Sequence, residues 1–327
     1  MAKKYCVTGG TGHIGFALCK ALAEKDAAVR LLLRGPSSIM AGFRFETVFG
    51  DILDYQSLVS AFNGMDTVFH VAGLVDINGI DEPKVWDVNV TGTENVWRAC
   101  KVCGVKRLVY VSSVDALPPL PKGETMTEIS SFDPAAVTGT YAKTKAAATK
   151  FLLDHVGEEP EIVICHPSAC IGPYDYKVSF AGVLVRYWLK RSIPFSLSFG
   201  GYNFVDVRDV AEGLIAAAEH GKDGSCYILS GAYVTVDAFL RLLAKLTNHR
   251  PPLLRFPYGM TVGLIPASEK YYDLMHKTPL FTGYTLRKLR DNGMFSHAKA
   301  TQELGYRPRS VEESLRDMLT WLQAEKA

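Results

Sequence analysis

The sequence has almost no net charge and no long apolar run. Its 327 residues include 36 lysines and arginines against 34 aspartates and glutamates, a formal net charge of +2 at pH 7. It has no basic stripe, so neither a nucleic acid nor an anionic membrane surface is expected as a partner. No apolar stretch approaches the roughly 20 residues that a membrane span needs, and Met1 to Lys4 lead directly into an apolar strand, which leaves no room for a secretory signal. We therefore expect a cytoplasmic protein.

The sequence also lacks a cysteine framework. Its seven cysteines are an odd number scattered through apolar segments, which is typical of a reducing compartment. Cys100 and Cys103 have C-x-x-C spacing, but no second pair or histidine follows at metal-site spacing, so we expect them to pack in the core. His155, His166 and His220 are scattered too. No metal site is predicted.

A glycine-rich turn opens the chain. Thr8-Gly9-Gly10-Thr11-Gly12-His13-Ile14-Gly15 follows an apolar run and precedes apolar residues at helical spacing. Glycine allows the tight turn and a close approach to a diphosphate, whose charge is met by N–H groups at the helix N-terminus. The context predicts a dinucleotide site. We expect His13 to be exposed or to lie along the cofactor, without a chemical role.

Two more features lie further along the chain. The apolar strand 107–112 leads to Ser112 and Ser113 at its end, where ligands bind in open parallel sheets. Tyr141 and Lys145 are one helical turn apart on the same face, and a nearby ammonium lowers a phenol pKa from about 10 toward neutrality. Taken separately, the serines could cap a helix and the Tyr-x-x-x-Lys spacing could belong to an exposed helix. Their order after the glycine turn favours an active site.

In this order the features resemble the extended branch of the short-chain dehydrogenase/reductase superfamily, over essentially the whole chain. The glycine turn fits Thr-Gly-x-x-Gly-x-x-Gly, and Ser113, Tyr141 and Lys145 fit Ser…Tyr-x-x-x-Lys. Lesser landmarks of the branch fit Asp51-Ile52, His70-Val71-Ala72-Gly73 and Asn89-Val90-Thr91-Gly92-Thr93.

The resemblance implies a catalytic role for three residues. Tyr141 would give a proton to the developing alkoxide in reduction and take it back in oxidation. Ser113 would hydrogen-bond the same oxygen, and Lys145 would lower the Tyr141 pKa while holding the nicotinamide ribose. Ser112 is the alternative serine, since the register differs by one residue.

The resemblance also implies a larger set of cofactor-binding residues. These are Gly9, Gly12, His13, Ile14, Gly15, Arg34, Ser37, Asp51, Ile52, Val71, Ala72, Gly73, Asn89, Tyr141, Lys145, Pro167 and Ser168.

The end of the second strand predicts which dinucleotide is used. Arg34 stands where an acidic residue would bind the ribose 2′-hydroxyl of NAD, whereas an arginine accommodates the 2′-phosphate of NADP. Arg34, with Ser37 as a further phosphate partner, therefore predicts NADP (NADPH). A solvated arginine at a strand end is the alternative.

Alternating apolar strands and amphipathic helices predict an α/β fold, a doubly wound parallel (Rossmann) sheet with a smaller, mostly helical C-terminal substrate domain. Residues 1–170 form the predicted NADP-binding domain, with a return segment at 203–230, and 171–202 and 231–327 form the substrate domain. The segment 114–139 reads as a long loop beside the active site, and 311–324 as an amphipathic helix. Strands are expected near 4–8, 28–33, 45–49, 67–72, 107–112 and 161–166.

The expected substrate is a small carbonyl or alcohol compound. Residues proposed for its pocket are richer in aromatic than in cationic groups, which favours an apolar or aromatic substrate; they are Asp115, Tyr174, Phe180, Phe195, Phe204 and 271–282. A sugar nucleotide would need cations for its diphosphate, which Lys177, Arg186 or Arg208 could supply. The aromatic residues could equally be the core of a helical domain.

We therefore predict an NADP(H)-dependent reductase similar to the dihydroflavonol reductase and 3β-hydroxysteroid dehydrogenase groups. One alternative is a nucleotide-sugar epimerase or dehydratase with retained NAD, which uses the same Ser, Tyr and Lys. Another is a catalytically silent NADP(H) sensor. Extended relatives often pair through long helices, which here predicts a homodimer through 82–103 and 139–155.

Overall fold

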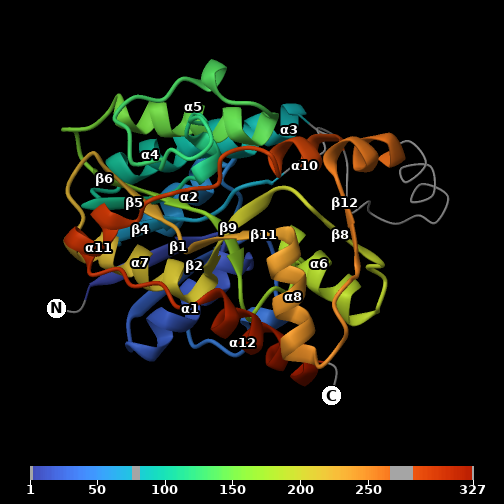
Figure 1. Ribbon diagram of the computed structural model, residues 1–327. Coiled ribbons are helices and arrows are strands. Elements are labelled where there is room, and N and C mark those ends of the chain that lie inside the picture. The colour runs from blue at the N-terminus through green and yellow to red at the C-terminus, as the bar shows by residue number, and fades with distance from the viewer. Residues whose placement is uncertain (1–2, 76–81, 266–282, 326–327) are drawn as a thin grey trace.

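A seven-stranded parallel sheet forms the centre of the larger part of the molecule (Figure 1), in a computed structural model that describes residues 3–75, 82–265 and 283–325. The strand order is β10-β6-β5-β4-β1-β2-β3. The chain winds outward from β1 in both directions, so ligands are expected in the crevice between the ends of β1 and β4. The strands are β1 Lys4–Thr8, β2 Ala28–Leu33, β3 Glu46–Phe49, β4 Thr67–His70, β5 Arg107–Val111, β6 Glu161–Pro167 and β10 Ser225–Leu229. This arrangement confirms the predicted doubly wound sheet.

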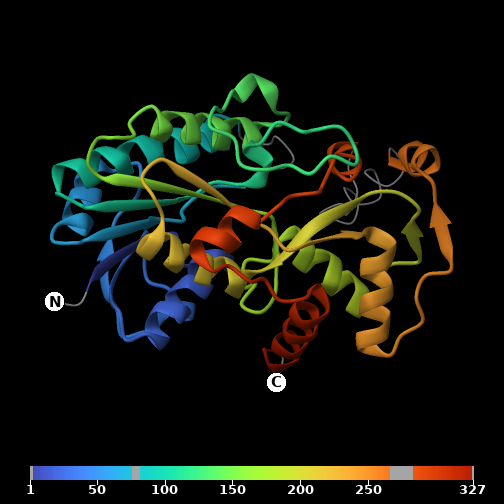
Figure 2. The same ribbon diagram turned by 60° about the vertical axis from the view of Figure 1, so that its left-hand side comes forward.

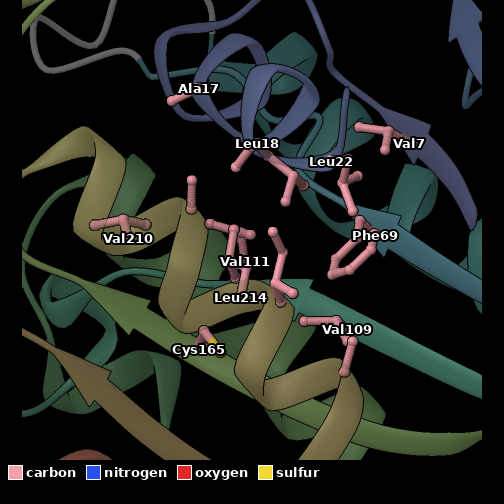
Figure 3. Packing of buried hydrophobic residues seen from close by; sticks show 14 of the residues in the cluster. Val7, Ala17, Leu18, Leu22, Phe69, Val109, Val111, Cys165, Val210 and Leu214 are labelled. Carbon is pink, nitrogen blue, oxygen red and sulfur yellow. The ribbon is translucent and has the colours of Figure 1, made fainter. Parts of the chain in front are cut away.

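Helices cover both faces of this sheet. One face carries α1 (His13–Glu24), α7 (Val207–His220) and α11 (Ala298–Leu304), and the other carries α2 (Tyr55–Phe62), α4 (Gly92–Val102) and α5 (Thr140–Leu153). Because successive strand side chains point to opposite faces, β5 sends Val109 and Val111 into the first core and Leu108 and Tyr110 into the second. Figure 3 shows the first core, where side chains of α1 and α7 meet those of the strands.

Short helical segments lie beside the carboxyl ends of the strands. Helix α3 (Glu82–Trp86) runs through a π-helical turn at Asp87–Thr91 into α4. Such turns often occur at functional sites, and this one carries Asn89. Single 3₁₀ turns lie at Ser38–Met40, Val114–Ala116 and Pro134–Ala136, and the last two interrupt the predicted loop at 114–139.

The C-terminal part has its own core and two small sheets (Figure 2). The order β11-β9-β7 joins Ala232–Thr235, Gly201–Asp206 and Ala169–Ile171, and β8 (Phe195–Leu197) pairs with β12 (Leu254–Phe256). The helices that pack here include α6 (Phe180–Leu189), α8 (Val236–Thr247), α10 (Gly283–Lys288) and α12 (Val311–Ala324). The predicted amphipathic helix at 311–324 is therefore confirmed.

Strand pairing refines the expected return segment at 203–230. β9 pairs with β7 and β11 in the smaller sheet, so the chain returns to the main sheet only with α7 and β10. β10 was not among the expected strands, although it pairs in parallel with β6 from Ser225 to Leu229. The division of the chain into two domains stays a prediction.

β10 is an edge strand whose outer backbone groups are bound by side chains. The N–H of Ile228 donates to Glu128 Oε1 at 2.9 Å. Two residues earlier, the carbonyl oxygen of Cys226 accepts from Lys299 Nζ at 3.0 Å. Side chains from two other segments therefore bind one outward-facing N–H and one outward-facing carbonyl oxygen of this edge.

Within the described ranges, no helix has both the length and the apolar character to cross a membrane. The same residues contain no group of three or more His, Cys, Asp or Glu side chains that could hold a metal ion. Cys100 is buried in the core beneath α4, and Cys103 is partly buried with its thiol 3.4 Å from the Val59 carbonyl oxygen.

Candidate active site

The glycine-rich turn joins β1 to α1 and is packed tightly enough to require glycine. Gly9 has a φ of +75°, and a Cβ there would lie 2.5 Å from the backbone nitrogen of Ala72. A Cβ on Gly15 would lie 2.1 Å from the Gly9 carbonyl oxygen. Gly12 precedes the helix and offers no side chain to cap it, so the first N–H groups of α1 can meet an anion. The turn therefore fits the diphosphate of a dinucleotide.

Hydrogen bonds join the end of β1 to the residues after β4 beside this turn. The Val71 N–H donates to the Thr8 carbonyl oxygen at 3.3 Å, and the Ala72 N–H donates to Thr8 Oγ1, also at 3.3 Å. The predicted cofactor residues Val71, Ala72 and Gly73 thus lie against the glycine turn, at the switch in strand order.

His13 is not exposed, contrary to one of the two expected placements. Its Nε2 donates to the carbonyl oxygen of Pro173 at 2.9 Å. Its Nδ1 is buried and has no hydrogen-bond partner among the described residues. Burial lowers the pKa of the imidazole, so the ring is held as a neutral group between α1 and the segment after β7.

The end of β2 carries a cation and no acid. Arg34 is exposed, and none of the ion pairs that the structure describes includes it. Ser37 precedes the 3₁₀ turn at Ser38–Met40 without capping it, so its hydroxyl is not used there. Asp51 lies beyond β3, where its carboxylate accepts from the Leu53 N–H at 2.9 Å, and Ile52 is buried beside it.

The two candidate serines have different partners. Ser112 is bound to α5 through its hydroxyl, 2.8 Å from Thr149 Oγ1. Ser113 is buried at the start of the 3₁₀ turn, where its Oγ accepts from the Asp115 N–H at 3.1 Å. That bond uses a lone pair and leaves the Ser113 O–H as a donor.

Lys145 is a fully enclosed cation on α5. Only 4% of the residue is exposed, and its Nζ donates to the Val111 carbonyl oxygen at 2.8 Å and to Tyr110 Oη at 3.3 Å. It also lies 4.8 Å from the centre of the Tyr110 ring. Burial lowers the Lys145 pKa to about 7. One of its three N–H groups remains for another acceptor.

Tyr141 lies one turn before Lys145 and is half-buried. Burial first, and then the neighbouring Tyr141, raise the pKa of Tyr110. The two tyrosines and Lys145 therefore form one electrostatic group beside the end of β5.

Asn89 joins the loop after β4 to α5 by hydrogen bonds. Its Oδ1 accepts from the Leu74 N–H at 2.8 Å, while its Nδ2 donates to the Leu74 carbonyl oxygen at 2.9 Å and to Thr144 Oγ1 at 3.0 Å. A Cβ on Gly73 would lie 3.2 Å from Lys145 Nζ. Asn89 thus acts as a support for this loop.

A buried polar chain that the sequence reasoning missed lies beneath these residues. His70 is bound on both sides, by Thr8 Oγ1 at 2.9 Å from Nδ1 and by Thr93 Oγ1 at 3.0 Å from Nε2. The Thr93 hydroxyl donates to the Asn89 carbonyl oxygen at 2.7 Å and also contacts Tyr110. Burial, reinforced by the Lys145 cation, lowers the His70 pKa to about 3. In the sequence, polar residues near the ends of the apolar strands β1, β4 and β5 were the pattern that could have predicted this buried chain.

His166 supports the serine turn from β6. Its Nδ1 donates to the Ser113 carbonyl oxygen at 3.0 Å, and its ring stacks on Phe132 at 5.3 Å. Burial lowers its pKa to about 4. Pro167 ends β6, and the buried hydroxyl of Ser168 beyond it has no partner within the part of the chain that the structure describes.

The residues expected in the substrate pocket lie in several places. Phe180 and Phe204 line an apolar cavity of about 20 Å³ between α6, α8 and β9. Tyr174 packs on Phe16 of α1, with ring centres 5.3 Å apart, and Phe195 stacks on Phe256 at 4.4 Å. Asp115 pairs with Lys288 of α10 at 3.2 Å. The expected pocket residues 271–282 lie outside the described residues.

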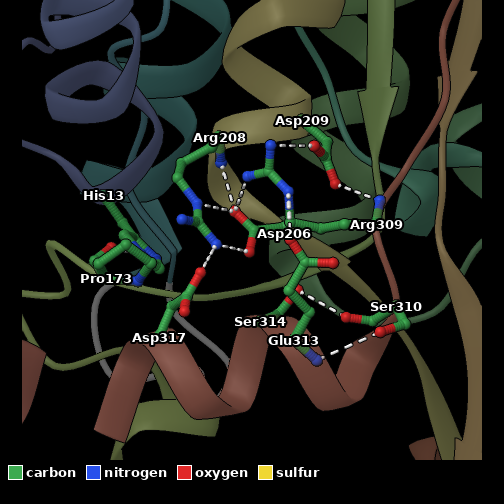
Figure 4. Close-up of polar contacts among 10 residues, drawn as sticks. All are labelled: His13, Pro173, Asp206, Arg208, Asp209, Arg309, Ser310, Glu313, Ser314 and Asp317. Atoms are coloured by element: carbon green, nitrogen blue, oxygen red, sulfur yellow. Dashed lines mark hydrogen bonds and ion pairs between the residues drawn. The ribbon is translucent and has the colours of Figure 1, made fainter. Parts of the chain in front are cut away.

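The three cations considered for a sugar diphosphate differ in their partners. Arg208 pairs with Asp206 at 2.8 Å and with Asp317 at 2.7 Å (Figure 4). Arg186 donates to the Asp175 carbonyl oxygen at 3.4 Å. Lys177 donates to Thr11 Oγ1 at 3.1 Å, in the glycine turn.

Comparisons with known proteins agree with this geometry. A sequence model described as "NAD dependent epimerase/dehydratase family" matches residues 5–229. Sterol demethylase protein B of Methylococcus capsulatus is 28% identical over 329 residues, covering 97% of each chain. A 3-beta-hydroxysteroid dehydrogenase of Mycolicibacterium neoaurum is 28% identical over 345 residues, covering 96% of this chain and 90% of that protein. The crystal structure of gox2253 superposes with a TM-score of 0.85 at 30% identity, over 99% of this chain and 98% of that one.

Proposed function

Because the chain belongs to the NAD-dependent epimerase/dehydratase family, we propose that it is an NADP(H)-dependent reductase that interconverts a carbonyl and an alcohol on an apolar or aromatic substrate. The observation that carries the proposal is the enclosed Lys145 ammonium, one helical turn from Tyr141 and beside the serine turn. A buried cation without a carboxylate partner is costly to the fold. In the proposed reaction this cation stabilises the Tyr141 phenolate.

The proton chemistry belongs to three side chains. When bound, the nicotinamide dinucleotide supplies or accepts the hydride. Tyr141 gives its phenolic proton to the substrate oxygen during reduction, and Ser113 donates its free O–H to the same oxygen. Lys145 favours the Tyr141 phenolate by its charge, and its remaining N–H would hold a ribose hydroxyl.

Two features support NADP over NAD. The exposed Arg34 at the end of β2 is available for a 2′-phosphate, and Ser37 beside it has a hydroxyl that caps no helix. An NAD site would use a carboxylate at the strand end to bind the 2′-hydroxyl. The nearest acid considered, Asp51, lies beyond β3 and holds its own turn.

The ion pairs of Arg208 and the position of Lys177 favour an apolar substrate over a sugar nucleotide. A nucleotide sugar carries a diphosphate that arginine or lysine would bind. Arg208 is neutralised by Asp206 and Asp317, and Lys177 points to the glycine turn. The names of two relatives, a sterol demethylase protein and a hydroxysteroid dehydrogenase, refer to sterols and steroids. These are large, mostly apolar molecules.

The test follows NADPH consumption across a panel of 3-ketosteroids, flavonoid ketones, aromatic aldehydes and sugar nucleotides, with products identified by mass spectrometry. We expect net NADPH loss with one apolar carbonyl class, and a Tyr141→Phe variant that binds NADPH normally but turns over at least about 100-fold more slowly. Sugar isomers or dehydrated sugars without net NADPH loss would replace the proposal with an epimerase or dehydratase. Near-normal turnover by Tyr141→Phe would remove its proton-transfer role.

A further inference from the structure

The segment that follows β7 of the smaller sheet folds back over the glycine turn. We call residues 173–178 the crossing loop. Its Pro173 accepts from His13 at 2.9 Å, at the first turn of α1. Its Tyr176 ring packs between Phe16 of α1 and Trp321 of α12, with ring centres 5.1 Å apart in both cases. The loop is therefore fixed on the end of α1 that faces the dinucleotide site.

The crossing loop is stiffened from within. Asp175 is 1% exposed, and its carboxylate accepts from the Ser179 N–H at 2.8 Å and the Ser179 hydroxyl at 2.8 Å. Tyr174 and Val178 have positive φ angles of 72° and 54°, which non-glycine residues adopt only when their surroundings enforce it. The loop therefore holds Lys177 in a defined place.

Lys177 extends from this loop to the phosphate-binding turn. Its Nζ donates to Thr11 Oγ1 at 3.1 Å, across 166 residues of sequence. The ammonium is exposed, and no aspartate or glutamate of the described residues pairs with it. No lysine or arginine lies in 5–19, so the turn itself supplies no cation.

From these contacts we propose that Lys177 is a diphosphate-binding residue for the dinucleotide, supplied to the glycine turn by the crossing loop. An ammonium at the rim of the turn adds a charge-assisted bond to those from the N-terminus of α1. Because Lys177 comes from the segment that leads into the C-terminal part, cofactor binding would also fasten the crossing loop to α1. The inference rests on the proposed use of a dinucleotide but not on the carbonyl substrate or on the 2′-phosphate.

Binding measurements test this without any turnover. Dissociation constants for NADPH, NADH and ADP-ribose would be determined by calorimetry for the wild type, Lys177→Gln, Lys177→Arg and Lys190→Gln. All three probes contain the diphosphate, so we expect Lys177→Gln to weaken each of them by a similar factor of about tenfold. Lys177→Arg keeps the charge and should stay within about threefold. Lys190 is exposed at the end of α6, so Lys190→Gln is the matched loss of one charge.

Salt and hydrogen exchange provide two further readouts. Raising the ionic strength should weaken NADH binding more in the wild type than in Lys177→Gln, because the lost contact is a screened charge pair. Amide exchange in 173–178 should slow on cofactor binding in the wild type and less in the variant. The proposal is overturned if Lys177→Gln binds all three probes as the wild type does, or if Lys190→Gln is equally weakened. A preference for NADH, or the lack of a carbonyl substrate, would contradict the proposed function. The ratios of variant to wild-type dissociation constants would still test Lys177, because they do not depend on turnover.

Discussion

Lys145 is a buried cation whose burial lowers stability and, in the proposed function, serves the proton chemistry. Its pKa of about 7 lies well below the ordinary value of 10.5. The unfolded chain therefore binds one more proton than the folded protein between these two values, and stability rises with pH across this window.

Replacing Lys145 should stabilise the protein while abolishing its activity. We expect Lys145→Met to be about 1 to 3 kcal/mol more stable than the wild type at pH 6, because a desolvated cation is replaced by an apolar chain. The difference should shrink as the pH rises toward 10. Urea unfolding of both proteins between pH 6 and 10 measures it, with the exposed Lys143→Met as the control on the same helix. A difference that stays constant with pH would contradict the burial account.

Arg34 decides which dinucleotide is preferred if its guanidinium meets a 2′-phosphate. Arg34→Asp should then lower kcat/KM for NADPH about 10- to 100-fold and raise the relative use of NADH, since a cation becomes an acid that suits a ribose hydroxyl. Initial rates with both cofactors give the ratio. Arg250→Asp reverses an exposed charge beyond α8 and should leave the ratio unchanged. An unaltered NADPH to NADH ratio in Arg34→Asp would remove the basis of the assignment.

The sequence predicted the residues of the site better than their partners. Tyr141 and Lys145 follow from helical spacing, and the glycines from the turn that they allow. The positions of His13 and Lys177 could not be predicted, because their partners Pro173 and Thr11 are 160 and 166 residues away in sequence. The role of Ser113, with Ser112 as the alternative, stays a prediction, to which the structure adds that Thr149 of α5 binds the Ser112 hydroxyl.

Among the elements, α7 and α12 are held together by charges that local patterns do not reveal. Asp206 is fully buried, accepts from the Arg208 backbone and guanidinium, and pairs with Arg309 at 3.4 Å (Figure 4). Burial acts to raise the Asp206 pKa, but its bonds to Arg208 outweigh burial and lower it. One carboxylate thus caps α7 and pairs with two arginines, which Asp317 and Asp209 also contact.

Removing this charge should destabilise the contact between α7 and α12. Asp206→Asn keeps an oxygen for the helix cap but removes the buried charge, so Arg208 keeps only the half-exposed Asp317 while Arg309 keeps Asp209 and Glu313. We expect the free energy of unfolding to fall by about 2 to 4 kcal/mol. Asp317→Asn removes the half-exposed partner of Arg208 and should cost less than about 1 kcal/mol. Urea unfolding compares the two. Equal losses would show that burial of the charge is not the cause.

The strands of the main sheet were predictable from their apolar runs, with the exception of β10. The six expected strands all occur: β1 and β2 have the expected ends, and each of the other four differs at one end by one or two residues. β10 was missed although four of its five residues are buried, because its place beside β6 depends on a chain reversal after β9. The small sheets of the C-terminal part have strands of three to six residues, too short for a clear period.

At the scale of the whole molecule, buried neutral histidines make the fold sensitive to acid. His70 and His166 have pKa values lowered by burial to about 3 and about 4, from an ordinary 6.5. Their contribution to stability is complete above pH 6.5 and is lost as the pH falls toward 4. Asp209 acts in the opposite direction. Burial raises its pKa to about 6, so its contribution to stability becomes more favourable as the pH falls through this value.

A variant of His166 isolates the contribution of this histidine to the acid sensitivity. His166→Gln can still donate to the Ser113 carbonyl oxygen but does not titrate. As the pH falls from 7 to 4, its free energy of unfolding should rise by about 2 to 3 kcal/mol relative to that of the wild type. Thermal unfolding across this range, with the exposed His220→Gln as control, gives the difference curve. Parallel curves for wild type and His166→Gln would exclude His166 as a source of acid sensitivity.

The outer side of β10 has a consequence for how copies of the protein meet. An open strand edge offers a template on which an extended peptide or a second chain can add a strand, which is a common route to aggregation. Here Glu128 and Lys299 already bind the outward-facing N–H of Ile228 and the carbonyl oxygen of Cys226. An incoming strand would have to displace two charged side chains of opposite sign before it could pair. This edge should therefore resist strand addition at high protein concentration.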